Sequence, residues 1–109
     1  MRYLLDTNVA LFLLGGRLRE SLPRGEYFVS VITEMELLSY PDLDEEAESA
    51  IRAFLEDLRI VGLTTSVKER AVRLRRGTKL KLPDAIIAAT ALELDAELFS
   101  TDVALGRVP

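Results

Sequence analysis

The stretch YLLDTNVALFLLGG (3–16) says most about the fold. It opens with a short apolar run that ends in an acid. This is typical of a central strand buried on both faces, and we predict a strand over YLLD (3–6). The residues from Asn8 to about Leu14 then predict a short helix, which Gly15-Gly16 would end. A strand followed at once by a helix is the first unit of an α/β pattern.

The rest of the chain repeats this alternation. Further strands are predicted at EYFVSVI (26–32), RIVGLT (59–64) and ELFST (97–101). The pattern predicts an α/β fold with a parallel sheet and right-handed crossovers, in one domain covering residues 1–109. The helices between the strands are predicted to begin at Thr33, at Asp42 or Asp44, at a capping box of Ser66 with Glu69, and at Pro83-Asp84.

The composition restricts the chemistry that this domain can perform. The chain has no His and no Cys, which excludes imidazole bases, thiolate nucleophiles, redox pairs and zinc sites made of these ligands. Its apolar runs are far shorter than the ~20 residues of a membrane helix, and the lack of Cys fits a reducing cytoplasm. Catalysis would depend on carboxylates, hydroxyls, Lys, Arg, Tyr, or a metal held by oxygen ligands.

Four carboxylates fall near the edge of the sheet where α/β proteins bind ligands. Asp6 closes the first strand, Glu36 lies one turn into the helix after the second, and Asp102 follows the fourth. Asp84 reaches this edge if its helix starts there. At ~5 Å and an effective dielectric constant of about 20, each pair would repel by roughly 3 kcal/mol, so the acids require protonation or a cation. Oxygen ligands without imidazole select Mg²⁺ or Mn²⁺ over Zn²⁺ and suit phosphodiester chemistry.

Each acid also has a purely structural explanation. Glu36 stands three residues after Thr33, as in a capping box. Asp84 would be stabilised at a helix N-terminus, and Asp102 would serve as a simple N-cap. Asp6 is the hardest to explain in this way, because a carboxylate at the end of an apolar strand is costly to bury without a partner.

At these residues the sequence resembles a PIN domain, and most closely the toxin ribonucleases of VapBC-type toxin–antitoxin pairs. In the second matching block the acid lies three residues after the Thr, which selects Glu36 rather than Glu34. The resemblance covers nearly the whole chain, in four blocks that follow the family order: YLLDTNV (3–9), SVITEMELL (30–38), LPDAIIAATAL (82–92) and LFSTD (98–102).

The resemblance implies a three-layer α/β sandwich around a parallel sheet in the order 3-2-1-4. The family's fifth edge strand is expected to be missing, because the chain stops at GRVP. The resemblance also implies endonucleolytic cleavage of RNA, a homodimer, and an antitoxin that occupies the pocket. By analogy, one or two Mg²⁺ or Mn²⁺ ions would be held by Asp6, Asp84 and Asp102, with Glu36 binding directly or through water. Three residues would support these acids: Thr7, Asn8 and Ser100.

The basic residues are concentrated in KERAVRLRRGTKLK (68–81), which carries +6, whereas the remainder carries −10. Helical spacing places Val67, Ala71 and Leu74 inward. One interpretation of the outward residues is a solvated helix face, and the other is contact with RNA phosphates or an acidic antitoxin tail. No aromatic residue lies in this segment, so we expect contacts with the RNA backbone rather than base stacking. The candidates are Arg70, Arg73, Arg76, Lys79 and Lys81.

Two other classes of function fit part of the pattern. A non-catalytic PIN-like module that binds RNA or protein would keep the fold and use the acids as caps, but the presence of all four acids argues against it. A receiver-like phosphoacceptor also places an Asp at a strand end. That domain needs an acidic pair before its first helix and a Lys after its last strand, whereas Thr7-Asn8 follow Asp6 and no Lys follows Lys81. We therefore expect a Mg²⁺- or Mn²⁺-dependent endoribonuclease that is the toxin of such a pair.

Overall fold

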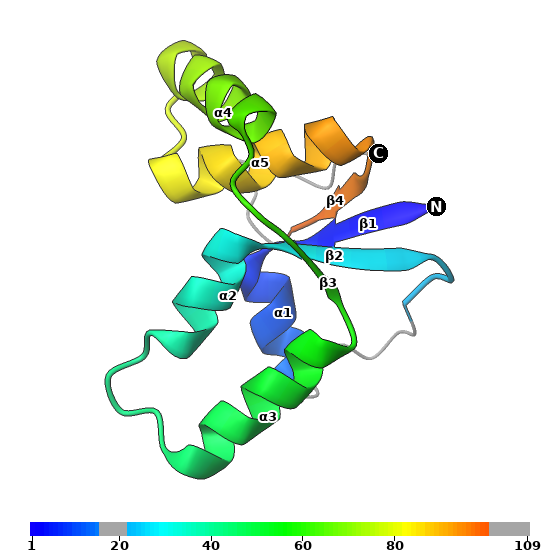
Figure 1. Ribbon diagram of the computed structural model, residues 1–109, viewed down its shortest axis with the longest axis vertical. Helices are drawn as coiled ribbons and strands as arrows, with labels where there is room; N and C mark the ends of the chain where they lie inside the picture. Colours follow the sequence, from blue (N-terminus) through cyan, green and yellow to red (C-terminus); the bar gives the residue numbers. More distant parts are fainter. Residues whose placement is uncertain (16–21, 101–109) are drawn as a thin grey trace.

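The computed structural model describes residues 1–15 and 22–100, in which strands and helices alternate as expected of an α/β protein (Figure 1). Gly16, Thr101, Asp102 and the expectation about a fifth strand lie outside the described residues. The elements are, in chain order, β1 (Arg2–Leu5), α1 (Thr7–Leu14), β2 (Glu26–Ser30), α2 (Val31–Leu38), α3 (Glu45–Glu56), β3 (Arg59–Val61), α4 (Thr65–Gly77), α5 (Leu82–Leu94) and β4 (Glu97–Phe99).

The described strands form one parallel sheet in the order β3-β2-β1-β4, which confirms the predicted order. Leu4 of β1 lies opposite Phe28 of β2 on one side and Leu98 of β4 on the other. β3 extends the sheet beyond β2, with Val29 opposite Ile60. β1 is therefore a central strand, and its apolar residues 3–5 are all buried.

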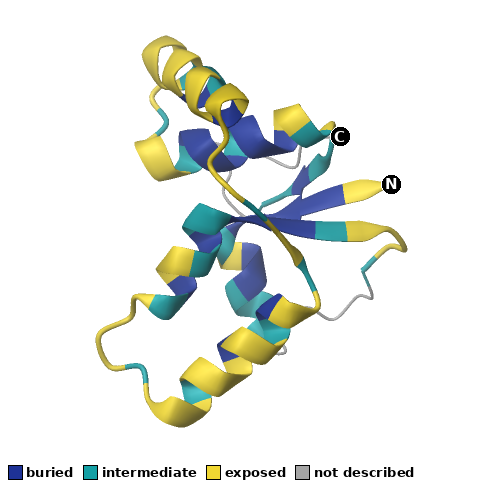
Figure 2. Ribbon diagram, in the orientation of Figure 1, coloured by how far each residue is buried: buried dark blue, intermediate teal, exposed yellow. Residues whose placement is uncertain are grey.

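Helices cover both faces of the sheet, which makes a three-layer sandwich (Figure 1). Successive strand residues point to opposite faces, so Leu5 and Val29 pack with α1, α2 and α3, whereas Leu4, Phe28 and Leu98 pack with α5. Figure 2 shows that the buried residues follow the sheet and α5, while the outer side of α4 is exposed.

The helix α4 packs on α5 rather than on the sheet. Val67 and Ala71 are buried against Ala85 and Ala89, and these small residues allow the two helices to approach closely. This confirms the predicted inward stripe of α4, in which Leu74 also packs against the cluster. The helix pair forms the upper part of the molecule in Figure 1.

The start of α2 differs from the prediction. The helix begins at Val31, two residues before Thr33, because the hydroxyl of Ser30 caps it by accepting a hydrogen bond of 3.1 Å from the Ile32 N–H. Val31 and Ile32 are therefore helical, although β-branched residues favour strands. The capping box of Thr33 with Glu36 is wrong for the same reason.

Other boundaries also depend on which hydroxyl or carboxylate acts as the cap. Thr64 accepts a hydrogen bond of 3.2 Å from the Val67 N–H and starts α4, so the predicted box of Ser66 with Glu69 is wrong. This start shortens β3, which ends at Val61 rather than at Thr64. Asp44 is the cap of α3.

None of the helices in the described part of the chain is long and apolar enough to cross a membrane.

Candidate active site

The carboxylate of Asp6 lies at the carboxyl end of β1 and is almost fully buried, with 3% of the residue exposed. Its Oδ1 accepts a hydrogen bond of 2.8 Å from the Val9 N–H, so Asp6 is also the N-cap of α1. Its Oδ2 accepts a hydrogen bond of 2.6 Å from the hydroxyl of Ser100, which directly follows β4. The first turn of α1 and the end of the neighbouring strand β4 thus fix the carboxylate in position.

Glu36 is held from the opposite helix. The hydroxyl of Thr7 on α1 donates a hydrogen bond of 2.6 Å to Glu36 Oε1 and lies 3.1 Å from the hydroxyl of Thr33. Because a hydroxyl carries one proton and Thr7 gives it to Glu36, Thr33 donates to Thr7. Thr33 and Glu36 are one turn apart on the face of α2 that points toward α1. Their spacing of three residues therefore lets both contact Thr7, and it does not form a capping box.

The structure brings three of the four predicted acids to one pocket. This pocket has a volume of about 680 Å³ and lies between α1, α2 and the start of α5. Asp6, Glu36 and Asp84 line it, together with Thr7 and Asn8. The helix of Asp84 therefore does begin at the edge where Asp6 lies. Asp102 lies outside the described residues.

The chemistry of the pocket fits a hard divalent cation. No Lys or Arg of the described residues lines it, whereas three carboxylates do. Within residues 1–15 and 22–100, no three acids lie close enough together to enclose a metal ion. Mg²⁺ does not need such a cage, because it keeps several waters and takes one or two carboxylates directly.

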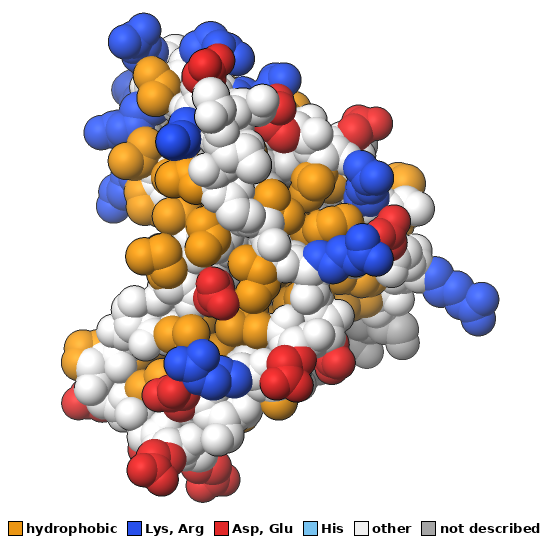
Figure 3. Space-filling model, viewed as in Figure 1, with side chains coloured by type: hydrophobic (Ala, Val, Ile, Leu, Met, Phe, Trp, Pro, Cys, Tyr) orange, Lys and Arg blue, Asp and Glu red, His pale blue; other side chains and the backbone are white. Residues whose placement is uncertain are grey.

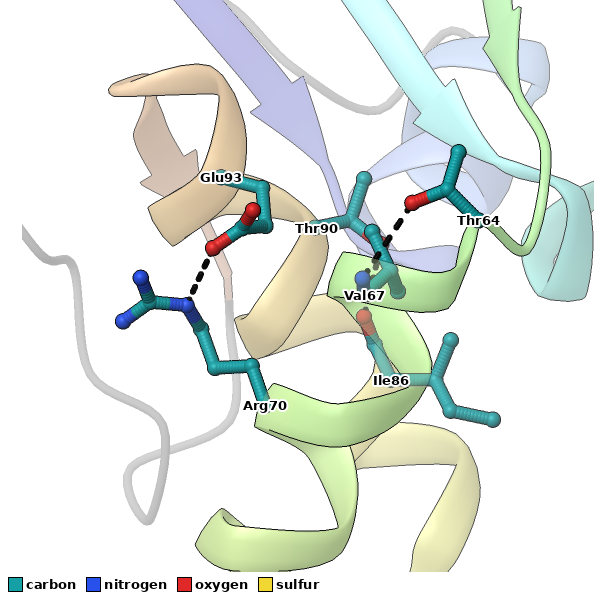
Figure 4. A network of polar contacts seen from close by, with 6 residues as sticks. All are labelled: Thr64, Val67, Arg70, Ile86, Thr90 and Glu93. Atoms are coloured by element: carbon teal, nitrogen blue, oxygen red, sulfur yellow. Dashed lines mark hydrogen bonds and ion pairs between the residues drawn. The ribbon is translucent and has the colours of Figure 1, made fainter.

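The basic candidates on α4 separate into two groups. Arg70 forms an ion pair of 2.5 Å with Glu93 of α5, and its side chain is partly buried (Figure 4). Arg73 and Arg76 are exposed and line a shallow depression on the outer side of α4, together with Lys68. The contact of Arg70 thus joins the two helices, while Arg73 and Arg76 face solvent.

Lys79 and Lys81 lie in the connection between α4 and α5, and both are exposed. Lys81 is the N-cap residue of α5, although its side chain does not cap the helix. It lies two residues before Pro83, which lines the pocket together with Asp84. Positive charge therefore lies next to the acidic pocket. Figure 3 shows Lys and Arg side chains gathered over α4 and acidic side chains over α3.

Two residues near these acids escaped the sequence analysis. Thr33 was interpreted as a helix cap, yet it is fully buried and bonded to Thr7. Tyr40, to which the sequence pattern gave no functional role, also lines the pocket. Its position one helical turn beyond Glu36 is the only sign of this in the sequence.

A family model described as PIN domain matches residues 3–109. The chain belongs to the PIN domain family. No curated protein matches it significantly. The expected resemblance to PIN domains of VapBC-type pairs is confirmed by the solved structures to which this PIN domain is similar.

One of these is a toxin-antitoxin complex from Klebsiella pneumoniae, in which a chain is 33% identical with a TM-score of 0.77, over 93% of this chain and 87% of that one. VapBC2 from Rickettsia felis, bound to a DNA fragment from its promoter, is 22% identical with a TM-score of 0.80, over 100% and 94%. DNA-bound VapBC from Salmonella typhimurium is 21% identical with a TM-score of 0.82, over 100% and 93%. At these lower identities the last two show the fold alone.

Proposed function

We propose that this PIN domain is a Mg²⁺- or Mn²⁺-dependent endoribonuclease and the toxin of a toxin–antitoxin pair. One observation carries the proposal: Asp6, Glu36 and Asp84 come from three different elements and line one pocket to which the described residues contribute no basic side chain. Three carboxylates that line one pocket repel one another. A cation bound among them would offset this repulsion, whereas an anionic ligand without a cation would be repelled.

The acids have different roles in this proposal. Asp6 and Asp84 would bind the ion, and Asp102 would join them. When bound, Mg²⁺ or Mn²⁺ lowers the pKa of a water and offsets charge on the phosphate. Asp6 is held by Val9 and Ser100, so it would bind without losing much conformational freedom. Thr7 fixes the oxygen of Glu36, and Asn8 lies beside them at the pocket wall.

RNA is the proposed substrate because positive charge adjoins the pocket. Lys79 and Lys81 are exposed next to the start of α5, and Arg73 and Arg76 are exposed further along α4. These four side chains would contact phosphates on the strand as it leaves the pocket. In this proposal Arg70 keeps its ion pair with Glu93 and does not contact RNA directly. It contributes only to the positive electrostatic potential of the basic segment.

The comparisons support a protein partner for this chain. The similar chain from Klebsiella pneumoniae belongs to a toxin-antitoxin complex, which supports a protein antitoxin for this chain as well. We propose in addition that the protein acts on cellular RNA in the cytoplasm and that two copies form a homodimer. A non-catalytic binding module remains the alternative that the following experiment separates.

Asp6→Asn and Asp84→Asn are expected to reduce RNA cleavage about 100-fold or more, because the neutral amide oxygen binds the ion much more weakly than a carboxylate does. Asn is as good an N-cap as Asp, so Asp6→Asn should fold. Asp44→Asn is the matched control, since Asp44 caps α3 in the same way but does not line the pocket. Cleavage of a labelled RNA and thermal unfolding are measured for all three variants.

Cleavage by the Asp6→Asn protein at the wild-type rate, without inhibition by EDTA, would contradict the proposal. Isothermal titration with Mn²⁺ provides a second measurement. A catalytic domain should show a binding heat that disappears in Asp6→Asn but not in Asp44→Asn. A silent binding module should show none in any variant.

A further inference from the structure

The wall of the acidic pocket is partly apolar, although a divalent ion would need only the acids of the pocket. Ile32 and Met35 of α2 and Tyr40 just after this helix line one side, and Pro83 and Ile87 of α5 line the other. The volume of about 680 Å³ lies within the range of roughly 300–1,000 Å³ that is usual for pockets of organic ligands. The pocket therefore has room for a nucleotide as well as a hydrated ion.

Tyr40 is the residue of this wall that is best placed to meet a base. It follows Ser39, which ends α2, and 47% of the residue is exposed. The other aromatic side chains are buried or half-buried, and two of them pack on Tyr3 with ring centroids 5.1 and 4.9 Å away. Within the described part of the chain, Tyr40 makes no ring contact of this kind and no side-chain hydrogen bond. Its ring is free to receive a ligand.

We propose that the ring of Tyr40 stacks on an unpaired base next to the scissile phosphodiester and so helps to select the cleavage site. This inference rests on the proposed ribonuclease function. Every base has a face that can stack on an aromatic ring, but only an unpaired base exposes it, so Tyr40 would favour single-stranded RNA. The expectation of backbone contacts concerned the basic segment alone, and Tyr40 lies outside that segment, directly after the C-cap of α2.

The opposite side of the pocket favours an anionic ligand, and RNA provides both phosphates for this side and bases for the ring of Tyr40. There, Lys79 and Lys81 lead to Pro83 and Asp84, so exposed positive charge adjoins the wall. A strand whose phosphates face these lysines can turn its bases toward α2. Figure 1 shows the C-terminal end of α2 and the start of α5 on the same side of the molecule.

The test combines protein variants with modified RNA. For a single-stranded RNA that is cut at one bond, Tyr40→Ala and Tyr40→Leu are expected to lower kcat/KM about 10-fold, and Tyr40→Phe to stay within about twofold of wild type. Leu92→Ala is the control, since Leu92 is an exposed apolar residue of α5 away from the pocket. Thermal unfolding shows whether each variant is folded, and Tyr40→Leu keeps an apolar side chain if Tyr40→Ala does not fold.

Replacing the stacked nucleotide by an abasic one should lower the wild-type kcat/KM by a similar factor of about 10 and should have no further effect in Tyr40→Ala. Additive losses, or full activity of Tyr40→Ala, would overturn the proposal. It would also be overturned if Tyr40→Ala weakened only the binding of an antitoxin and left RNA cleavage unchanged, because the ring would then serve a protein partner.

A wild-type protein that cuts no RNA would contradict the proposed function, and stacking is then measured separately. In a short single-stranded RNA that carries the fluorescent base 2-aminopurine, the fluorescence of this base should be quenched on binding to the wild type and not on binding to Tyr40→Ala. Equal fluorescence with both proteins would overturn the role of Tyr40.

Discussion

The carboxylate of Asp6 combines a role in folding with one in the proposed chemistry. Val9 and Ser100 each donate one hydrogen bond to it, and an ionised carboxylate has about four sites that accept. Capping α1 therefore leaves acceptor sites for a cation. The structural and the functional explanations of this residue, which the sequence presents as alternatives, are compatible.

Thr7→Val tests how Glu36 is held. The substitution keeps the shape of the side chain but removes the hydroxyl that contacts Glu36 and Thr33. Because Thr33 is fully buried, its hydroxyl loses a partner, and the protein should be about 1–2 kcal/mol less stable. We expect kcat to fall about 10-fold as Glu36 loses its orientation, whereas Thr7→Ser should stay close to wild type.

The measurements for Thr7→Val are steady-state RNA cleavage, which gives kcat, and urea unfolding. Thr65→Val is a suitable control because Thr65 is exposed at the start of α4. An unchanged kcat in Thr7→Val would show that the orientation of Glu36 does not depend on this hydroxyl.

At the scale of elements, the caps decide which side chains reach the pocket. Ser30 starts α2 immediately after β2, and this start turns Thr33 and Glu36 toward α1. If the helix began at Thr33, both residues would lie in its first turn. The hydroxyl of Thr33 would then accept a hydrogen bond from the backbone of that turn instead of contacting Thr7. Similarly, α5 begins one residue before Pro83, which places Asp84 at the pocket.

Close packing at Gly25 holds the amino-terminal ends of the strands together, opposite the pocket. Gly25 lies directly before β2. A Cβ at this position would lie 2.6 Å from the Met1 carbonyl oxygen and 2.7 Å from the Tyr3 ring. Gly25→Ala should therefore destabilise the fold by about 1–3 kcal/mol in urea unfolding. Gly62→Ala is the control, since its Cβ would meet nothing within 4 Å. Equal stability of both variants would contradict the tight packing at Gly25.

At the scale of the whole molecule, charge is divided between two regions. Residues 68–81, on α4 and the following connection, carry +6, whereas residues 42–57, around α3, carry −6. Figure 3 shows these regions at opposite ends of the molecule, with α4 at the top and α3 at the bottom. A polyanion is attracted to the first region and repelled by the second, so RNA should approach the pocket over α4 and α5.

Replacing both Arg73 and Arg76 by Gln is expected to raise KM for RNA and to leave kcat nearly unchanged. The dependence of log KM on log salt concentration should become shallower by about 1.4, since each of the two contacts to a single-stranded phosphate contributes about 0.7. Arg52→Gln is the control, because Arg52 is exposed on α3 and pairs with Glu48. KM values over a series of KCl concentrations provide the measurement, and an unchanged slope would mean that these arginines do not meet the RNA backbone.

Local pattern was enough to predict the order of strands and helices along the chain and the parallel sheet, because periodicity and strand–helix alternation are properties of neighbouring residues. The order of the strands within the sheet was implied only by the resemblance to PIN domains, because it depends on which distant segments pair. Local pattern also placed Asp6 at a strand end, since an acid that closes a buried run has few structural explanations. The helix starts were less predictable. Ser30, Thr33, Thr64 and Ser66 are all good caps by type, and packing selected among them.

Contacts between distant residues were decided only by the tertiary structure. Arg70 looked like its neighbours Arg73 and Arg76 until α5 placed Glu93 beside it, 23 residues away. Ser100 meets Asp6 across 94 residues because β4 pairs with β1. Tyr40 joins the acids because α2 runs along the pocket. The amino-acid sequence by itself determined which residue types were available to bind a cation and RNA. The packing of helices on the sheet decided which of them share a pocket, because side chains from separate elements meet only when those elements pack together.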